Sequence, residues 1–350
     1  MNLSINLLRY IGSPFNPESE VTLRCHNEFI FENASFELLE IATKNRMPLF
    51  FLTALKKRNE LAKLKLMYDR MNEESINSFD AMSRVSNILC NKGIENVIFK
   101  TIRPYPATTV DIDVIILKSK KEYIRSRDIL INHGYESVGF KQDAETFRDP
   151  HININVDLYP EITVSKIIYL DKEKLTSYMI EKVLPNEKSV VTLNPHADLI
   201  CLIAHSIIKE QMYTLSEYYS TLYFLSQTKL SEIKKFVDMI HENSIINAAQ
   251  AHISITAKLH EVAHNFIPEK IVKIIDDIDM NKIELKNIEK NYRTPHKFHP
   301  LTVGTCLLEK MAKEEVARKS LAKQLLSMTN FNFSKDFLNK IIKNVRRESY

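Results

Sequence analysis

Two aspartates separated by one residue are the clearest candidates for chemistry in this chain. Asp111 and Asp113 lie in the segment Thr109-Val-Asp-Ile-Asp-Val-Ile-Ile-Leu117, whose other residues are mostly apolar. Side chains two residues apart on a β-strand point to the same face of the sheet, so both carboxylates would share one face. Like charges that close repel each other unless a cation lies between them. Mg²⁺ binds carboxylate oxygens and leaves room for phosphate, so the pair indicates metal-dependent phosphoryl or nucleotidyl transfer.

A third carboxylate follows on a strictly alternating segment, Ile152–Tyr159, where Asp157 shares a face with Asn153 and Asn155. If this segment pairs beside the strand of Asp111 and Asp113, three carboxylates converge. Such a set suits two Mg²⁺ or Mn²⁺ ions, one activating an attacking hydroxyl and one neutralising a pyrophosphate leaving group. The alternatives are a solvated strand end for the first two aspartates and a turn cap for Asp157.

The elements that would position these carboxylates follow from changes in hydrophobic period. Residues 35–91 have a helical pattern, and Gly93 is placed to end it as a left-handed cap. Between 93 and 160 the pattern alternates, with one helix at 120–133 opened by a capping box at Ser119. The strands expected there are 95–102, 109–118, 136–142, 145–148 and 152–159. This mixture predicts an α+β unit.

Beyond Pro185 the pattern is helical again, opening with an Asn194-Pro195 cap. The helices expected there are 195–210, 214–227, 230–243, 245–265, 268–277, 305–328 and 334–347. We therefore expect three parts: an N-terminal helical region at 1–91, a catalytic core at 92–190 and a C-terminal helical domain at 191–350.

Composition restricts the class of protein. The chain has 350 residues, 44% of them hydrophobic and 26% charged, which is typical of a globular protein with two or three cores. No apolar run reaches the roughly 20 residues that a membrane helix needs, and no signal peptide is evident, so we expect a cytoplasmic protein without a membrane partner. The four cysteines form no Cys-x-x-Cys pair, which argues against zinc ribbons. No Gly-x-Gly-x-x-Gly or Walker-type loop is present.

The order of these motifs resembles the nucleotidyltransferase superfamily with the small DNA-polymerase-β-like fold, and most closely its family of uncharacterised nucleotidyltransferases. The segments that carry the resemblance are Phe36-Glu-Leu-Leu-Glu-Ile-Ala-Thr-Lys-Asn-Arg-Met-Pro-Leu-Phe-Phe51, Lys92-Gly-Ile-Glu-Asn-Val-Ile-Phe-Lys100, Asp111-Ile-Asp113, Val156-Asp-Leu-Tyr159 and Asp198-Leu-Ile-Cys-Leu-Ile-Ala-His205. The match spans about 35–225. It implies a small mixed-sheet core, flanked by helices, that transfers a nucleoside monophosphate from a nucleoside triphosphate such as ATP to a hydroxyl acceptor.

The resemblance also assigns roles to single residues. Asp111 and Asp113 would hold the metal ions, while Asp157 would complete one metal site and help to deprotonate the acceptor. The superfamily usually carries Gly-Ser or Gly-Gly upstream of the aspartates, and the closer family carries Lys-Gly, whereas this chain has Lys100-Thr101. The candidate nucleotide-binding residues supply cations or hydroxyls near that turn: Lys100, Thr101, Arg103, Thr108 and Thr109.

The acceptor is left open between an RNA 3′ end, a protein and a small molecule. The basic pattern of 334–347 slightly favours RNA, although a solvated helix face is the commoner fate of such a pattern. A catalytically weak or inactive binding or regulatory protein on the same fold is the alternative, because the expected Gly-Ser is missing.

A more remote alternative is a zinc hydrolase. His260-Glu-Val-Ala-His264 places two histidines four residues apart, a spacing at which both can bind zinc on one helix face. The same segment also fits an ordinary amphipathic helix. His296 and His299 are expected in a surface loop, and His205 is expected to be a hydrogen-bonded core residue.

Overall fold

The computed structural model describes residues 2–16, 28–140 and 144–327. Two compact units emerge from the described residues. Unit 1 comprises the described parts of 1–68 and 202–313, and unit 2 comprises those of 69–201 and 314–339. The boundaries therefore differ from the expected division at 91 and 190. The expected basic helix at 334–347 lies outside the described residues.

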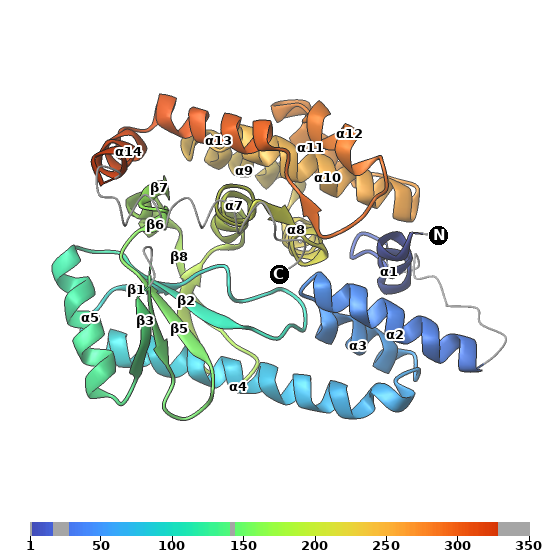
Figure 1. The fold of residues 1–350 in the computed structure, drawn as a ribbon, viewed down its shortest axis with the longest axis horizontal. Helices are drawn as coiled ribbons and strands as arrows, with labels where there is room; N and C mark the ends of the chain where they lie inside the picture. The colour runs from blue at the N-terminus through green and yellow to red at the C-terminus, as the bar shows by residue number, and fades with distance from the viewer. Residues whose placement is uncertain (1, 17–27, 141–143, 328–350) are drawn as a thin grey trace. The chain divides into compact units, whose positions relative to one another are not determined.

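Unit 2 is built on one mixed seven-stranded sheet with the order β3-β4-β5-β2-β1-β9-β8 (Figure 1). Its strands are β1 (Asn96–Ile98), β2 (Asp111–Ile116), β3 (Glu136–Phe140), β4 (Glu145–Arg148), β5 (Asn155–Tyr159), β8 (Met179–Val183) and β9 (Ser189–Leu193). Strand β2 lies between β1, which is antiparallel to it, and β5, which is parallel to it. The mixed α+β class is confirmed. The strand expected at 145–148 has those bounds, and the strands expected at 109–118 and 152–159 are present with shifted ends.

The core of unit 2 lies between one face of this sheet and two helices, α4 (Lys65–Cys90) and α5 (Lys120–Asn132) (Figure 1). Val85 and Leu130 of the two helices belong to the same buried cluster as Ile112 and Val114 of β2. Because side chains alternate along a strand, burying Ile112 and Val114 on this face sends the neighbouring aspartates to the opposite face.

Local sequence signals set the boundaries of these helices. Gly93 adopts φ +71°, a left-handed conformation that glycine takes without steric cost, and its N–H bonds the Cys90 carbonyl at 2.9 Å. The Ser119 side chain accepts from the Glu122 N–H and opens α5. The predicted cap at Gly93 and the Ser119 N-cap are confirmed, whereas the return bond from the Glu122 side chain that would complete a capping box is not found among the described residues.

The other elements of unit 2 are short. They are the hairpin β6 (Ile162–Val164) and β7 (Ile167–Leu170), α6 (Lys172–Leu175), η3 (Thr176–Tyr178) and α14 (Glu315–Ser327). Helix α7 (Pro195–Ala204) begins in this unit, and the Asn194 side chain accepts from the Ala197 N–H at 3.0 Å, as the sequence predicts.

Unit 1 is helical and is organised around α10 (Ile246–His264), which packs against α1, α11, α12 and α13. Its other elements are α1 (Leu3–Ile11), α2 (Glu28–Lys44), α3 (Pro48–Lys57), η2 (Ala62–Leu64), η4 (His205–Glu210), β10 (Met212–Tyr213), α8 (Leu215–Gln227), η5 (Leu230–Glu232), α9 (Ile233–Glu242), α11 (Glu269–Ile278), α12 (Lys282–Ile288), β11 (His296–Lys297) and α13 (Pro300–Lys313). Helix α10 is buried on nearly all sides, which is typical of a central helix.

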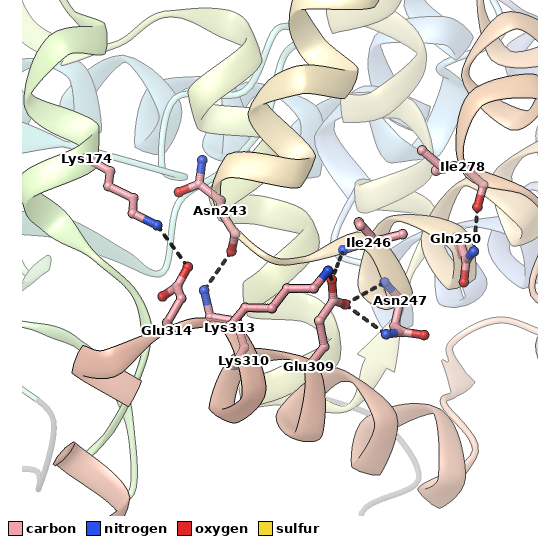
Figure 2. A network of polar contacts seen from close by, with 10 residues as sticks. All are labelled: Lys174, Asn243, Ile246, Asn247, Gln250, Ile278, Glu309, Lys310, Lys313 and Glu314. Atoms are coloured by element: carbon pink, nitrogen blue, oxygen red, sulfur yellow. Dashed lines mark hydrogen bonds and ion pairs between the residues drawn. The ribbon is translucent and has the colours of Figure 1, made fainter. Parts of the chain in front are cut away.

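A glutamate from α13 caps the N-terminus of α10. The residue before α10, Ile245, makes no side-chain cap hydrogen bond. Instead, the Glu309 carboxylate accepts from the backbone N–H groups of Ile246 and Asn247, at 3.1 and 2.9 Å (Figure 2). A carboxylate at a helix N-terminus satisfies free N–H groups and interacts favourably with the helix dipole.

Two elements differ from the sequence pattern. The segment 1–30, whose hydrophobic pattern is weak, contains α1. The helix expected at 305–328 is two helices, because α13 ends at Lys313 and α14 begins at Glu315. No proline or glycine marks this break in the sequence. The buried Glu314 between the two helices pairs with Lys174 at 3.0 Å (Figure 2).

Candidate active site

The aspartates identified from the sequence lie on two adjacent parallel strands of unit 2. The register of β2 and β5 pairs Asp113 with Asp157 and Asp111 with Asn155. Paired residues on neighbouring strands project to the same face of a sheet. Asp113 and Asp157 are buried, at 6% and 3% exposure, whereas Asp111 is half-buried at the start of β2. The pairing of the two strands, on which the expected convergence depended, is therefore present.

Asp113 already carries a cation. The Lys100 ammonium lies 3.0 Å from Asp113 Oδ1, and both side chains are more than nine-tenths buried. The same ammonium lies 5.2 Å from the ring centroids of Phe99 and Tyr159. The candidate phosphate-binding lysine is therefore placed against a candidate metal ligand.

The turn that carries Lys100 is held by backbone contacts. Lys100 adopts φ +49°, in the left-handed region that favours glycine. Its N–H donates to Asp198 Oδ1 at 2.6 Å. The Thr101 hydroxyl donates to the Phe99 carbonyl at 3.2 Å and accepts from the Asp113 N–H at 3.0 Å. Because a hydroxyl has a single proton, Thr101 in this arrangement has none to give to a phosphate.

Asp198 is a buried carboxyl that sequence reasoning placed on a helix but assigned no role. Burial raises its pKa from 3.8 to about 6, while the Lys100 N–H and the positive charge of Arg103 act in the opposite direction. Arg103, expected to bind triphosphate, thus lies close enough to Asp198 to affect it. The other two candidates, Thr108 and Thr109, are half-buried in the connection that leads into β2.

Tyr159 lies two residues beyond Asp157 on the same face of β5. Burial raises the pKa of its hydroxyl well above the usual value, and the charges of Asp113, Asp157 and Asp111 raise it further. All three carboxylates therefore act on this one hydroxyl, which remains protonated at neutral pH. This influence agrees with the register of β2 and β5, which places the three carboxylates on one face of the sheet.

Asp157 is oriented by the neighbouring antiparallel strand. The Thr146 hydroxyl, on β4, donates to Asp157 Oδ1 at 2.5 Å, and the strand register places these two residues opposite each other. A hydroxyl donor to a carboxylate fixes its direction and satisfies part of its hydrogen-bonding capacity.

The carboxylates of Asp111, Asp113 and Asp157 have the right chemistry to hold a hard cation, because Mg²⁺ and Mn²⁺ prefer carboxylate oxygens. As the side chains lie, no group of three or more His, Cys, Asp or Glu among the described residues is arranged to hold a metal ion. Asp113 is instead paired with Lys100, and Asp157 with Thr146. Metal binding would therefore require these carboxylates to exchange partners.

The His-Glu-x-x-His segment lies on α10, and its first histidine is fully engaged. His260 Nδ1 donates to the Phe266 carbonyl at 2.7 Å, which leaves Nε2 to accept from the Ser13 hydroxyl at 2.8 Å. Burial lowers the pKa of His264 to about 4, with smaller contributions from His260 and Arg9. A guanidinium beside His264 opposes a zinc ion, so this geometry does not favour a zinc site.

The expected surface loop around His296 is wrong. His296 is buried, and its Nε2 lies 2.8 Å from Glu284 Oε2. Burial alone would raise the pKa of Glu284, but hydrogen bonds from His296, Thr302 and the His299 N–H bring it below its ordinary value. His205 lies 3.3 Å from Glu210, largely buried as expected.

No protein-family model matches the chain, and no curated protein matches it. Among the described helices, none has both the length and the apolarity to cross a membrane. The resemblance to nucleotidyltransferases therefore stays a prediction from the quoted motifs.

Three residues of the site were not assigned from the sequence. Tyr159 had a readable signal, because it continues the alternation that selected Asp157. Thr146 and Asp198 had none, since their contacts depend on the pairing of β4 with β5 and on the packing of α7 against the Lys100 turn.

Proposed function

We propose that the chain is a metal-dependent nucleotidyltransferase that transfers a nucleoside monophosphate from a nucleoside triphosphate to a hydroxyl acceptor. The observation that carries this proposal is the parallel register of β2 and β5, which pairs Asp113 with Asp157 and keeps Asp111 on the same face. Carboxylates from two adjacent strands are the donor set that a metal-assisted displacement at phosphorus requires.

When bound, Mg²⁺ would polarise the phosphate and stabilise the pyrophosphate leaving group. The residues of the chain supply the rest. Asp157 would accept the proton of the acceptor hydroxyl, after releasing Thr146. Arg103, beside the Lys100 turn, would contribute positive charge to the triphosphate. Burial, and after it the charges of Asp113, Asp157 and Asp111, raise the pKa of the Tyr159 hydroxyl, so it is protonated beside the site.

The Lys100-Thr101 turn adds support through its backbone. Lys100 takes the left-handed conformation that glycine favours. We infer that Lys100, rather than Thr101, takes the position of the first glycine in the Gly-Ser pair of the superfamily. Thr101 would then correspond to the serine. On this proposal, the departure from the family pattern is a side chain added at a position whose left-handed backbone would suit glycine.

The test is transfer of label from α-labelled nucleoside triphosphates, with Mg²⁺ or Mn²⁺, to a panel of RNA, protein and small-molecule acceptors. We expect wild-type chain to label an acceptor, and Asp113→Asn and Asp157→Asn to lose the activity. Asp128→Asn, on the exposed side of α5, is the matched control and should retain it. Transfer that survives both substitutions at Asp113 and Asp157 would overturn the proposal.

A second candidate is a binding or regulatory protein without catalysis. The observation that favours it is the Lys100–Asp113 ion pair, which already offsets part of the negative charge without a metal. This candidate predicts nucleotide or RNA binding by the wild-type chain together with no label transfer to any acceptor. RNA as the favoured acceptor remains part of the proposal, and binding of a labelled RNA 3′ end in the same assays tests it.

A further inference from the structure

The ion pair between Lys100 and Asp113 has the features of an occupied cation site. The ammonium lies 3.0 Å from Asp113 Oδ1, with 7% of the lysine side chain and 9% of the aspartate side chain exposed. Two aromatic rings, those of Phe99 and Tyr159, flank the ammonium. Breaking a buried pair by removing one partner leaves an uncompensated charge, so the Lys100 ammonium compensates the buried carboxylate of Asp113.

The backbone at Lys100 is adapted to this placement. A left-handed φ of +49° is uncommon for a residue with a side chain and is favoured by glycine. The conformation is held by the 2.6 Å hydrogen bond from the Lys100 N–H to Asp198 and by the two bonds of Thr101. These contacts would suit a glycine equally well, so the lysine side chain is an addition to the turn that serves a purpose at Asp113.

We propose that the Lys100 ammonium is a built-in cation that occupies Asp113 until a divalent metal ion replaces it, and that the displaced lysine then binds the triphosphate that arrives with the metal. This inference rests on the proposed function, because it takes the three aspartates to be the metal ligands. It adds a coupling: metal alone binds weakly, since it must expel a buried ammonium, whereas metal and triphosphate together give that ammonium a new anionic partner.

Charge balance explains why the two cations exclude each other. Lys100 supplies one positive charge against the three carboxylates of Asp111, Asp113 and Asp157. A divalent ion on the same oxygens would meet an ammonium at short distance, and repulsion in a poorly solvated site is strong. Lys100 must therefore leave Asp113 when a metal enters. Its flexible side chain can move without changing the turn, which is held through the backbone.

The test measures binding of Mn²⁺ alone to the full chain, by the loss of the electron paramagnetic resonance signal of free Mn²⁺. Five proteins are compared: wild type, Lys100→Met, Lys100→Gly, Lys100→Arg and Asp113→Asn. Methionine keeps the length of the side chain and removes its charge, and arginine keeps the charge. Lys100→Gly is the second neutral variant, because glycine suits the left-handed backbone and guards against a folding defect. Thermal unfolding with and without Mn²⁺ is recorded for each protein.

We expect Lys100→Met and Lys100→Gly to bind Mn²⁺ at least about tenfold more tightly than the wild type, because no buried ammonium has to be expelled. Lys100→Arg should bind as weakly as the wild type, and Asp113→Asn should bind least. Mn²⁺ should raise the unfolding temperature of the two neutral variants more than that of the wild type.

Equal Mn²⁺ affinity in wild type and both neutral variants, lost in Asp113→Asn, would overturn the competition and leave the proposed function standing. Absence of Mn²⁺ binding in every protein, with the neutral variants folded, would overturn both. The two failures are therefore distinguishable by whether the wild type and the two neutral variants bind Mn²⁺.

Discussion

At the scale of single residues, unit 2 buries charged side chains beside one another around the Lys100 turn. Asp198 is fully buried and accepts the Lys100 N–H, while the Lys100 ammonium reaches Asp113. A buried carboxyl held mainly by a backbone donor is disfavoured in its ionised form, which is why burial raises the pKa of Asp198 to about 6. The turn therefore depends on a group that titrates near neutral pH.

Asp198→Asn should change how stability depends on pH. Because the pKa of Asp198 is raised by folding, from 3.8 to about 6, the folded chain binds more protons than the unfolded chain between these values, and Asp198 lowers stability as pH rises. Asparagine keeps an acceptor for the Lys100 N–H and does not titrate. Relative to wild type, the variant should gain about 2 kcal/mol of unfolding free energy between about pH 4.5 and pH 7.5, measured by urea denaturation. The same difference at both pH values would contradict this assignment.

The sequence was informative about residues on strands and silent about those that meet through packing. Alternation alone selected Asp111, Asp113 and Asp157, and it would also have selected Tyr159. The pairing of Lys100 with Asp113 could not be predicted, because it depends on a left-handed turn at a residue that is not glycine. Propensity rules place such turns at glycine or asparagine.

At the scale of elements, β2 and β5 are joined beyond their register by a buried lysine. The Lys172 ammonium donates to three backbone carbonyls near the ends of these strands, those of Ile116, Lys118 and Pro160, at 3.2, 2.9 and 2.6 Å. It also lies 3.0 Å from a carboxylate oxygen of Glu161. Lys172 therefore holds together, at the far end, the two strands whose near end carries the aspartates.

Lys172→Met should destabilise the chain by about 3 kcal/mol, because it leaves buried carbonyls without donors and a carboxylate without its cation. Lys118→Met is the matched control: its ammonium lies on the surface with Glu95, and its loss should leave stability nearly unchanged. Urea denaturation of both variants measures the effect. Equal stability of the two variants would show that the Lys172 contacts do not support the strands.

The Glu309 contact between α13 and α10 gives a second prediction about elements. Glu309→Ala would leave the N–H groups of Ile246 and Asn247 without an acceptor, so we expect a loss of about 2 kcal/mol in unfolding free energy. Glu309→Gln retains one side-chain acceptor and should lose less. If alanine and glutamine were equally destabilising in urea titrations, the hydrogen bonds to α10 would not be the cause.

Helix caps were predictable from the sequence, whereas strand order was not. Gly93, Ser119 and Asn194 end or begin helices where the local signals place them. The parallel pairing of β1 with β9, by contrast, joins segments far apart in the chain, and no local pattern reports such a partner. The break between α13 and α14 was missed for a similar reason: no local signal marks it, and the buried Glu314 at the break pairs with Lys174, which is distant in the sequence.

At the scale of the molecule, every residue of the candidate site belongs to unit 2. The division into compact units places most of α4 and all of α14 with the sheet, and places the helices from α8 to α13 with the N-terminal helices. The sequence was divided where the hydrophobic period changes. Such a division could not predict these units, because both helical regions have the same period and unit 1 combines segments that are distant in the chain.

Ligand binding should be measurable as a property of the whole chain. A non-hydrolysable nucleoside triphosphate with Mg²⁺, at a hundred times its dissociation constant, should add about 2.7 kcal/mol to the unfolding free energy. If Lys100 couples the two ligands as proposed, the increase should be small with either ligand alone. Thermal unfolding of wild type and Asp113→Asn provides the comparison. An equal shift in Asp113→Asn would place the nucleotide elsewhere.

The most direct measurement of the central claim compares ATP labelled at the α-phosphate with ATP labelled at the γ-phosphate, in parallel reactions with Mg²⁺ and the acceptor panel. The proposed nucleotidyl transfer predicts α-label on the acceptor and γ-label in pyrophosphate, with both lost in Asp113→Asn and Asp157→Asn. Label from the γ-phosphate on the acceptor, or α-label transfer that persists in these variants, would contradict a nucleotidyl transfer by the paired aspartates of β2 and β5.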